Sequence, residues 1–174
     1  MKGIIGIVAI MLGIAWPLAS ALADTGQATI SGTQEGSTIS GTAQLEDTEE
    51  GLKISIQING APPGLHGIHI HEFGGCADGG QAAGGHFNPD GAQHGFLPEQ
   101  GLKAAHAGDL GNIQIDDKGQ GRLDFTLPGL TLTGTKYSVE GRAVILHELK
   151  DDFGQPSGNA GGRIGCGSIV LMGS

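Results

Sequence analysis

Apolar and polar residues alternate with a period of two along much of the chain, a pattern typical of β-strands with one buried face. Residues 52–58 are the clearest example, because Glu49 and Glu50 precede them and the turn segment Gly60–Gly64 follows. Similar runs occur at residues 38–46, 64–72, 112–116, 121–127, 137–147 and 163–172. No long segment shows a clear helical period. Many short strands separated by turn residues predict an all-β protein, either an antiparallel sandwich or a barrel.

Two long segments, residues 73–108 and 148–162, interrupt this pattern and are rich in glycine. Loops of this length are uncommon in a compact domain and are usually functional or disordered. The chain has 34 Gly and 7 Pro among 174 residues, a share close to that of disordered sequences. Because these residues fall in clusters between the apolar alternations and form no short repeat, we expect an ordered fold with two long functional loops.

The N-terminus has the pattern of a secretory signal peptide. Lys2 is followed by an uncharged apolar run that ends in small residues just before Asp24. The alternative is an uncleaved membrane anchor, since about 20 apolar residues can span a bilayer. Pro17 and the small residues favour cleavage. We therefore predict a cleaved signal peptide at residues 1–23 and one periplasmic or secreted domain at residues 24–174.

The exported part of the chain is acidic. Lys2 is the only charged residue before it, so residues 24–174 carry 8 basic and 18 acidic side chains, a net charge of −10. Such a charge repels polyanions, and the sequence has neither a basic run nor an aromatic platform for bases. We therefore expect no nucleic-acid partner and, after signal cleavage, no membrane partner. A sandwich with two faces and several edges could form a homodimer, although the sequence shows no large apolar patch that predicts a dimer interface.

Both cysteines, Cys76 and Cys166, belong to the exported part, where disulfides persist. An even number of cysteines in an oxidising compartment favours one disulfide bond over two buried thiols or a metal-bound thiol. The bond would close a loop of about 90 residues, worth roughly 4–5 kcal/mol on the chain-entropy estimate.

The seven histidines lie only in the two long segments and in the strand ends that border them. His69 and His71 occupy alternate positions of one predicted strand, so their side chains point to the same face. Two parallel imidazoles on a rigid strand can bind one metal ion; the alternative is a pair of ordinary polar residues on an outer face. Asp109, three residues after His106, can complete a zinc site. These ligands exceed the need of one tetrahedral ion, which indicates two metals, or one metal with many supporting residues.

Five motifs, in this order along the chain, closely resemble those of the copper/zinc superoxide dismutase family: GLHGIHIHEFGGC, GGHFNPDGAQHG, HAGDLGN, HELKDD and GNAGGRIGCG. The resemblance spans nearly all of the exported part. It implies a Greek-key β-sandwich or flattened barrel of about eight strands, in agreement with the strand pattern. It also implies an enzyme that converts superoxide into dioxygen and hydrogen peroxide with a redox-cycling copper and a structural zinc.

The resemblance assigns the histidines to the two metals. The implied copper ligands are His69, His71, His86 and His147, and the implied zinc ligands are His86, His94, His106 and Asp109. His86 would bridge the two ions, release copper when the copper is reduced, and deliver a proton in the second half of the cycle. Three or four nitrogen ligands suit Cu(II), and three nitrogens with one oxygen suit Zn(II).

Further residues match supporting positions of the family. Asp151 matches a carboxylate that links a copper histidine to a zinc histidine; the alternative is a solvated loop acid beside Asp152. His66 matches a structural histidine that hydrogen-bonds to the backbone. Cys76 and Cys166 match an intrasubunit disulfide.

Arg163 matches the arginine at the mouth of the copper site, and the resemblance makes it a catalytic residue together with His86. A local positive charge is needed there, because a net charge of −10 repels superoxide and salt screens charges beyond about 8 Å. The alternative is an exposed arginine at a strand edge. Ser157 matches a hydroxyl in the wall of the substrate channel.

The chain departs from the fuller animal-type pattern in both loops. The segment 94–106 is about three residues longer than expected, and the loop after Asp152 lacks the steering lysine and glutamates, for which Lys150 and Lys103 are substitutes. Three other functions compete with the enzyme: periplasmic copper and zinc storage or delivery, a copper-only member, and a structural sandwich. Storage would need neither Arg163 nor an open copper position. A copper-only protein would lack zinc ligands, and a structural protein gives no reason for clustered histidines.

Overall fold

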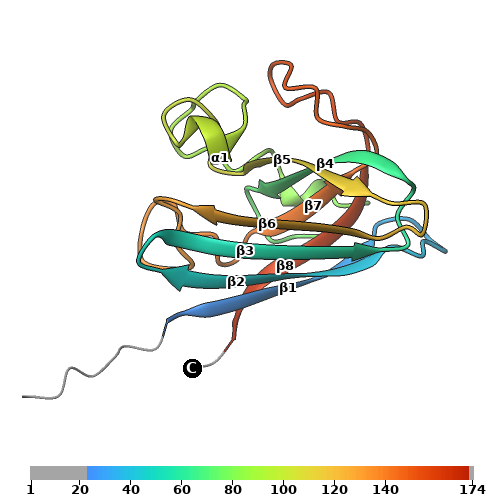
Figure 1. Ribbon diagram of the computed structural model, residues 1–174, viewed down its shortest axis with the longest axis horizontal. Coiled ribbons are helices and arrows are strands. Elements are labelled where there is room, and N and C mark those ends of the chain that lie inside the picture. The colour runs from blue at the N-terminus through green and yellow to red at the C-terminus, as the bar shows by residue number, and fades with distance from the viewer. Residues whose placement is uncertain (1–22, 173–174) are drawn as a thin grey trace, which may run out of the picture.

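The computed structural model describes residues 23–172, so residues 1–22 of the predicted signal peptide lie outside the described part. Figure 1 shows a β-barrel with longer loops gathered over one side. The strands are β1 (Thr25–Gly32), β2 (Ser40–Thr48), β3 (Gly51–Asn59), β4 (Gly64–His71), β5 (Asp109–Ile115), β6 (Gly121–Leu127), β7 (Ala143–His147) and β8 (Arg163–Met172). A short helix, α1 (Leu97–Gln100), lies in the first long loop. No helix of the described residues is long and apolar enough to cross a membrane.

The strands of the described chain form one closed antiparallel barrel in the order β1-β2-β3-β6-β5-β4-β7-β8, with β8 pairing back to β1. The connection from β3 to β4 passes over two strands, because β3 pairs with β6 while β4 lies between β5 and β7. This non-sequential order is the Greek-key arrangement. The predicted all-β antiparallel barrel of about eight strands is confirmed.

Two elements differ from the predicted strands. β1 is absent from the prediction because glycine and alanine fill its first buried positions, so that Ile30 is its one large buried side chain. The predicted strand 137–147 begins only at Ala143. Gly141 adopts a φ of 72°, which interrupts extended backbone just before β7.

Aliphatic side chains fill the barrel, while His69 and His71 alternate with the buried Ile68 and Ile70 and so lie on the outer face of β4. Every second residue of β3 from Leu52 to Ile58 is at most 1% exposed. In β4 both faces are buried from His66 onward, because the two long loops cover its outer face. The Gly67 N–H donates to the Leu149 carbonyl in one of these loops at 2.8 Å. This cover creates a second buried region, beneath the loops and outside the aliphatic core.

Candidate metal centre

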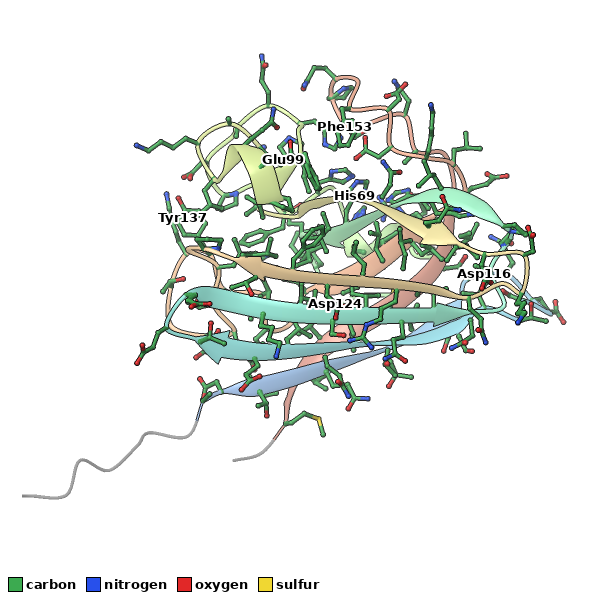
Figure 2. The ribbon with its side chains drawn as sticks, in the orientation of Figure 1. His69, Glu99, Asp116, Asp124, Tyr137 and Phe153 are labelled. Carbon is green, nitrogen blue, oxygen red and sulfur yellow. A yellow bond between two sulfur atoms is a disulfide. The ribbon has the colours of Figure 1, made fainter. Side chains whose placement is uncertain are left out.

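His69 and His71 lie on the outer face of β4, and both are at most 1% exposed. Figure 2 shows His69 beneath the loop that carries Phe153. Nε2 of His69 lies 2.8 Å from an Asp151 carboxylate oxygen, while its Nδ1 is buried without a hydrogen-bond partner. Nδ1 of His71 donates to the Gly84 carbonyl at 3.0 Å, which leaves a lone pair on Nε2. Each ring therefore has one nitrogen fixed by a hydrogen bond and the other available as a ligand.

Four imidazoles form what we call the first histidine group: His69, His71, His86 and His147. Their ligand-type nitrogens lie within 4.8 Å of one another. β7 supplies His147 at its end, and an isolated bridge between His71 and His86 brings the loop histidine alongside β4. The Nε2 atoms of His71 and His147 are 3.3 Å apart, a spacing that a cation shared by both nitrogens would stabilise.

The second histidine group consists of three imidazoles and a carboxylate, with ligand-type atoms again within 4.8 Å: His86, His94, His106 and Asp109. The backbone N–H groups of Gly95 and His106 donate to one Asp109 oxygen at 2.8 and 3.0 Å, so the carboxylate is fixed in place. Nδ1 of His94 lies 3.0 Å from the same oxygen but lacks hydrogen-bond geometry to it. A cation between the two atoms would satisfy both.

His86 belongs to both groups. Its Nδ1 lies 2.8 Å from Asp109 Oδ1 and 3.4 Å from His106 Nδ1, so this nitrogen faces the second group. The two nitrogens of an imidazole point in different directions, which leaves Nε2 as the atom available to the first group. One ring therefore connects two adjacent sets of ligand-type atoms.

Asp151 is a second connection between the groups. It is 2% exposed, with one oxygen 2.8 Å from Nε2 of His69 and both oxygens 3.0 Å from Nε2 of His94. Asn112 holds its backbone from both sides, accepting from the Asp151 N–H at 2.7 Å and donating to the Asp151 carbonyl at 2.9 Å. Asp151 is therefore not a solvated loop acid.

Burial keeps three rings of the first group neutral: His69, His71 and His147. Transfer of an imidazolium from water into the protein is unfavourable, and this lowers the pKa of His69 to about 4, of His71 to about 2 and of His147 to about 3. Repulsion from a neighbouring histidine adds to the burial effect in each case. All three rings are neutral at pH 7, the form of imidazole that binds metals.

In the second group, attraction between histidines and carboxylates outweighs the effect of burial on the pKa values. Burial alone lowers the pKa of His94, but its contacts with Asp109 and Asp151 outweigh burial and raise the pKa to about 9. Burial likewise raises the pKa of Asp109, but the three histidines of the group hold it well below its ordinary value. With the metal absent, a proton on His94 compensates the carboxylates, and a bound cation would replace that proton.

Comparison with known proteins decides the family. Residues 39–169 match the sequence model described as copper/zinc superoxide dismutase. The chain belongs to the copper/zinc superoxide dismutase family. A similar solved structure is that of the clock protein EA4, which is 34% identical, with a TM-score of 0.75, and whose match covers 90% of this chain and 100% of that chain. The resemblance that the five motifs carry is confirmed.

The donor sets fit the metals of this family. Four imidazole nitrogens suit copper(II), and three nitrogens with a carboxylate oxygen suit tetrahedral zinc. The buried Nδ1 atoms of His69 and His94 have no hydrogen-bond partner among the described residues, whereas buried polar atoms normally have one. A metal in each group would satisfy both atoms.

Two predicted supporting features lie beside the groups. His66 is buried on β4, where its ring nitrogens lie 2.9 Å from the carbonyl oxygens of His147 and Pro62. It belongs to neither group and ties the end of β7 to the turn before β4. Cys76 and Cys166 form a disulfide with Cα atoms 5.7 Å apart, so the predicted bridge is confirmed. It attaches the first long loop to β8.

Arg163 is half-buried at the start of β8. Its Nη1 and Nη2 donate to the carbonyl oxygens of Gly80 and Gly84, each at 2.6 Å. The Gly84 carbonyl also accepts from Nδ1 of His71, so a shared acceptor connects the guanidinium to the first group. Arg163 is therefore not a free arginine at a strand edge.

Ser157, the predicted wall of the substrate channel, is not brought to the histidines. It is exposed on the second long loop, and no hydrogen bond joins it to a histidine of the described chain. Its neighbour Gly158 packs against Asp151 and His94, on the side of the second group.

Sequence reasoning missed three residues that hold the site: Asn112, Gly84 and Gln155. Asn112 ends the motif HAGDLGN, so its place in that motif was a usable signal. Gly84 acts through its main-chain carbonyl, and the identity of a side chain does not indicate such a role. Gln155 contacts the backbone of His94 from the other loop, and a single glutamine in a loop gives no signal.

Proposed function

We propose that the first histidine group binds copper, that the second binds zinc, and that the protein converts superoxide into dioxygen and hydrogen peroxide. The shared His86 ring is the observation that carries this proposal, since separate storage sites have no need for a common imidazole. Membership of the family supports the same reaction.

In the overall reaction, one superoxide gives up an electron and leaves as dioxygen. The other takes up that electron with two protons and leaves as hydrogen peroxide. Bound copper would supply the one-electron acceptor and donor, whereas zinc keeps a single oxidation state. The chain's part is to hold the imidazoles in place and to keep Nε2 of His86 at the boundary of the groups. That atom can hold a proton while Nδ1 stays against Asp109.

Arg163 supplies the positive charge that an anionic substrate requires. Both of its acceptors are neutral carbonyls, and no ion pair to Arg163 occurs within the described residues. Its charge is therefore fixed in position without being neutralised. In a domain with a net charge of −10, this charge acts over about a Debye length, roughly 8 Å, near the first group.

A turnover assay distinguishes this enzyme from a copper and zinc storage or delivery protein. The metal-free protein is loaded with equimolar copper and zinc, and superoxide consumption is compared with that of the zinc-only form. We expect consumption only with copper present, with two metals bound per chain. Binding of both metals without added consumption would support storage and overturn the proposed reaction.

We also propose that residues 24–174 act outside the cytoplasm, in the periplasm or the medium. The Cys76–Cys166 disulfide supports this location, because disulfides persist in oxidising compartments. N-terminal sequencing of the exported protein should give Asp24 as the first residue. Recovery of the chain only from the cytoplasm, with its N-terminus intact, would contradict the proposal.

A further inference from the structure

The backbone of His94 is held by a side chain from the other long loop. Its N–H donates to Oε1 of Gln155 at 3.0 Å, and its carbonyl accepts from Nε2 of Gln155 at 2.8 Å. The two partners fix the orientation of the amide, because a carbonyl can only accept and an N–H can only donate. One glutamine thus satisfies both main-chain polar groups of a single residue across 61 positions of sequence.

His94, the residue held in this way, contacts both carboxylates at the second group. His94 lies in irregular backbone outside any strand, so no sheet ladder fixes its position. Its Nδ1 lies 3.0 Å from Asp109 and its Nε2 3.0 Å from Asp151. The next residue, Gly95, donates its N–H to Asp109 at 2.8 Å. A displacement of the His94 backbone therefore moves a ligand-type nitrogen and a hydrogen bond of the Asp109 carboxylate together.

Aromatic contacts bring the same two loops together next to the amide. The Phe153 ring stacks on the His94 ring, with centroids 6.4 Å apart and planes at 21°. Phe153 also contacts Phe96, at a centroid distance of 6.0 Å. Figure 2 shows Phe153 between the two loops, above His69. The second loop therefore reaches His94 through the Asp151 carboxylate, through this ring, and through the Gln155 amide.

We propose that Gln155 is a positioning residue for the second histidine group. It holds the His94 backbone in the position from which the His94 ring can bind the metal. This inference rests on the proposed function, because it takes the second group to be the zinc site. The bidentate amide replaces the backbone pairing that His94 lacks. Because Gln155 is itself exposed, water competes for either hydrogen bond, and the expected effect lies near the lower end of the 10–100-fold range for residues that support metal ligands.

The test is a zinc competition titration with a chelator, on the metal-free wild type and on Gln155→Ala. We expect about a tenfold loss of zinc affinity in the variant. Cobalt(II), bound in place of zinc, should show altered visible absorption bands, which a purely structural role would leave unchanged. Gln93→Ala is the matched control, because Gln93 is exposed beside His94 in the same surface pocket and makes no side-chain hydrogen bond among the described residues.

The outcomes separate this inference from the proposed function. Wild-type protein that binds zinc, with Gln155→Ala and Gln93→Ala both within twofold of it, would overturn the role of Gln155 alone. Wild-type protein that binds no zinc would overturn the proposed function and this inference with it. If Gln155→Ala does not fold, Gln155→Glu is the second variant. It keeps the acceptor but places a carboxylate against the His94 carbonyl, so it should also lose zinc affinity and shift the cobalt bands.

Discussion

Reduction of the Cys76–Cys166 disulfide should destabilise the metal-free protein by several kcal/mol. The bond joins residues 90 positions apart, and opening a loop of that length lowers the free energy of the unfolded chain by about 4.6 kcal/mol on the chain-entropy estimate. Measured losses for native disulfides are commonly about 2–5 kcal/mol. We therefore expect a loss of about 3–4 kcal/mol, equivalent to a fall of about 10 °C in Tm for a domain of this size.

Contacts other than the disulfide should hold the folded loop in place. The Phe73 N–H donates to the Ala83 carbonyl at 2.9 Å, and Arg163 donates to Gly80 and Gly84 at 2.6 Å each. The folded state should therefore change little on reduction, and the effect should arise in the unfolded chain. Because the free energy of unfolding is compared between two forms of one sequence, no substituted side chain enters the difference.

Urea unfolding followed by circular dichroism measures this difference, with the metal-free protein oxidised or treated with a phosphine reductant. The double variant Cys76→Ala, Cys166→Ala is the control and should not respond to the reductant. A loss below about 1 kcal/mol in the wild type would contradict this prediction, since it would mean that the unfolded chain gains little freedom when the loop opens.

Three further predictions concern charge and protonation. Arg163→Glu should lower the second-order rate with superoxide and reverse its salt dependence; an unchanged rate would exclude steering by this residue. Asp151→Asn should weaken zinc binding about 10–100-fold in a chelator competition, because the neutral amide removes the negative charge between the two imidazoles and replaces one acceptor oxygen with an NH₂ donor; wild-type affinity would exclude that role. The free energy of unfolding of the metal-free protein should fall between about pH 6.5 and pH 4, because the unfolded chain takes up protons that three buried histidines of the first group refuse. Urea titrations at four pH values would check this, and a flat profile would contradict it.

Three histidines of the first group set the sign of the pH effect in the upper part of this window, because they outnumber His94, which acts in the opposite direction near pH 6.5. His94, with its pKa raised to about 9, is protonated in both states at the acid end and contributes no slope there. Asp109 and Asp151 have lowered pKa values, so their contributions begin to be lost only below about pH 5, where the carboxyls of the unfolded chain take up protons. The slope between about pH 6.5 and pH 5 therefore reports mainly the buried neutral histidines.

The parts of the fold that sequence could predict are those with large side chains at alternate positions. β3 was predicted because four branched residues face the core in strict alternation. β1 was missed because small residues occupy its inward positions, and its place in the barrel depends on pairing with β2 and β8. The local pattern of apolar and polar residues does not show which distant strands will pair.

The candidate site divides in a similar way. The pairing of His69 with His71 follows from strand geometry, whereas the approach of Asp151 to His69, 82 residues away, could be expected only from the family motifs. The contact of Gln155 with His94 could not be predicted at all. It joins a side chain to main-chain groups, and such a contact constrains neither the spacing nor the identity of other residues.

The most direct test of the account is the decay of superoxide after pulse radiolysis, measured at two salt concentrations. Residues 24–174 are used in the oxidised form, loaded with equimolar copper and zinc, and compared with the zinc-only form. The proposed reaction predicts a second-order rate constant on the order of 10⁸–10⁹ M⁻¹s⁻¹ that falls as salt is added. A rate no higher than that of the zinc-only form would contradict it, because the first histidine group would then hold copper without turnover.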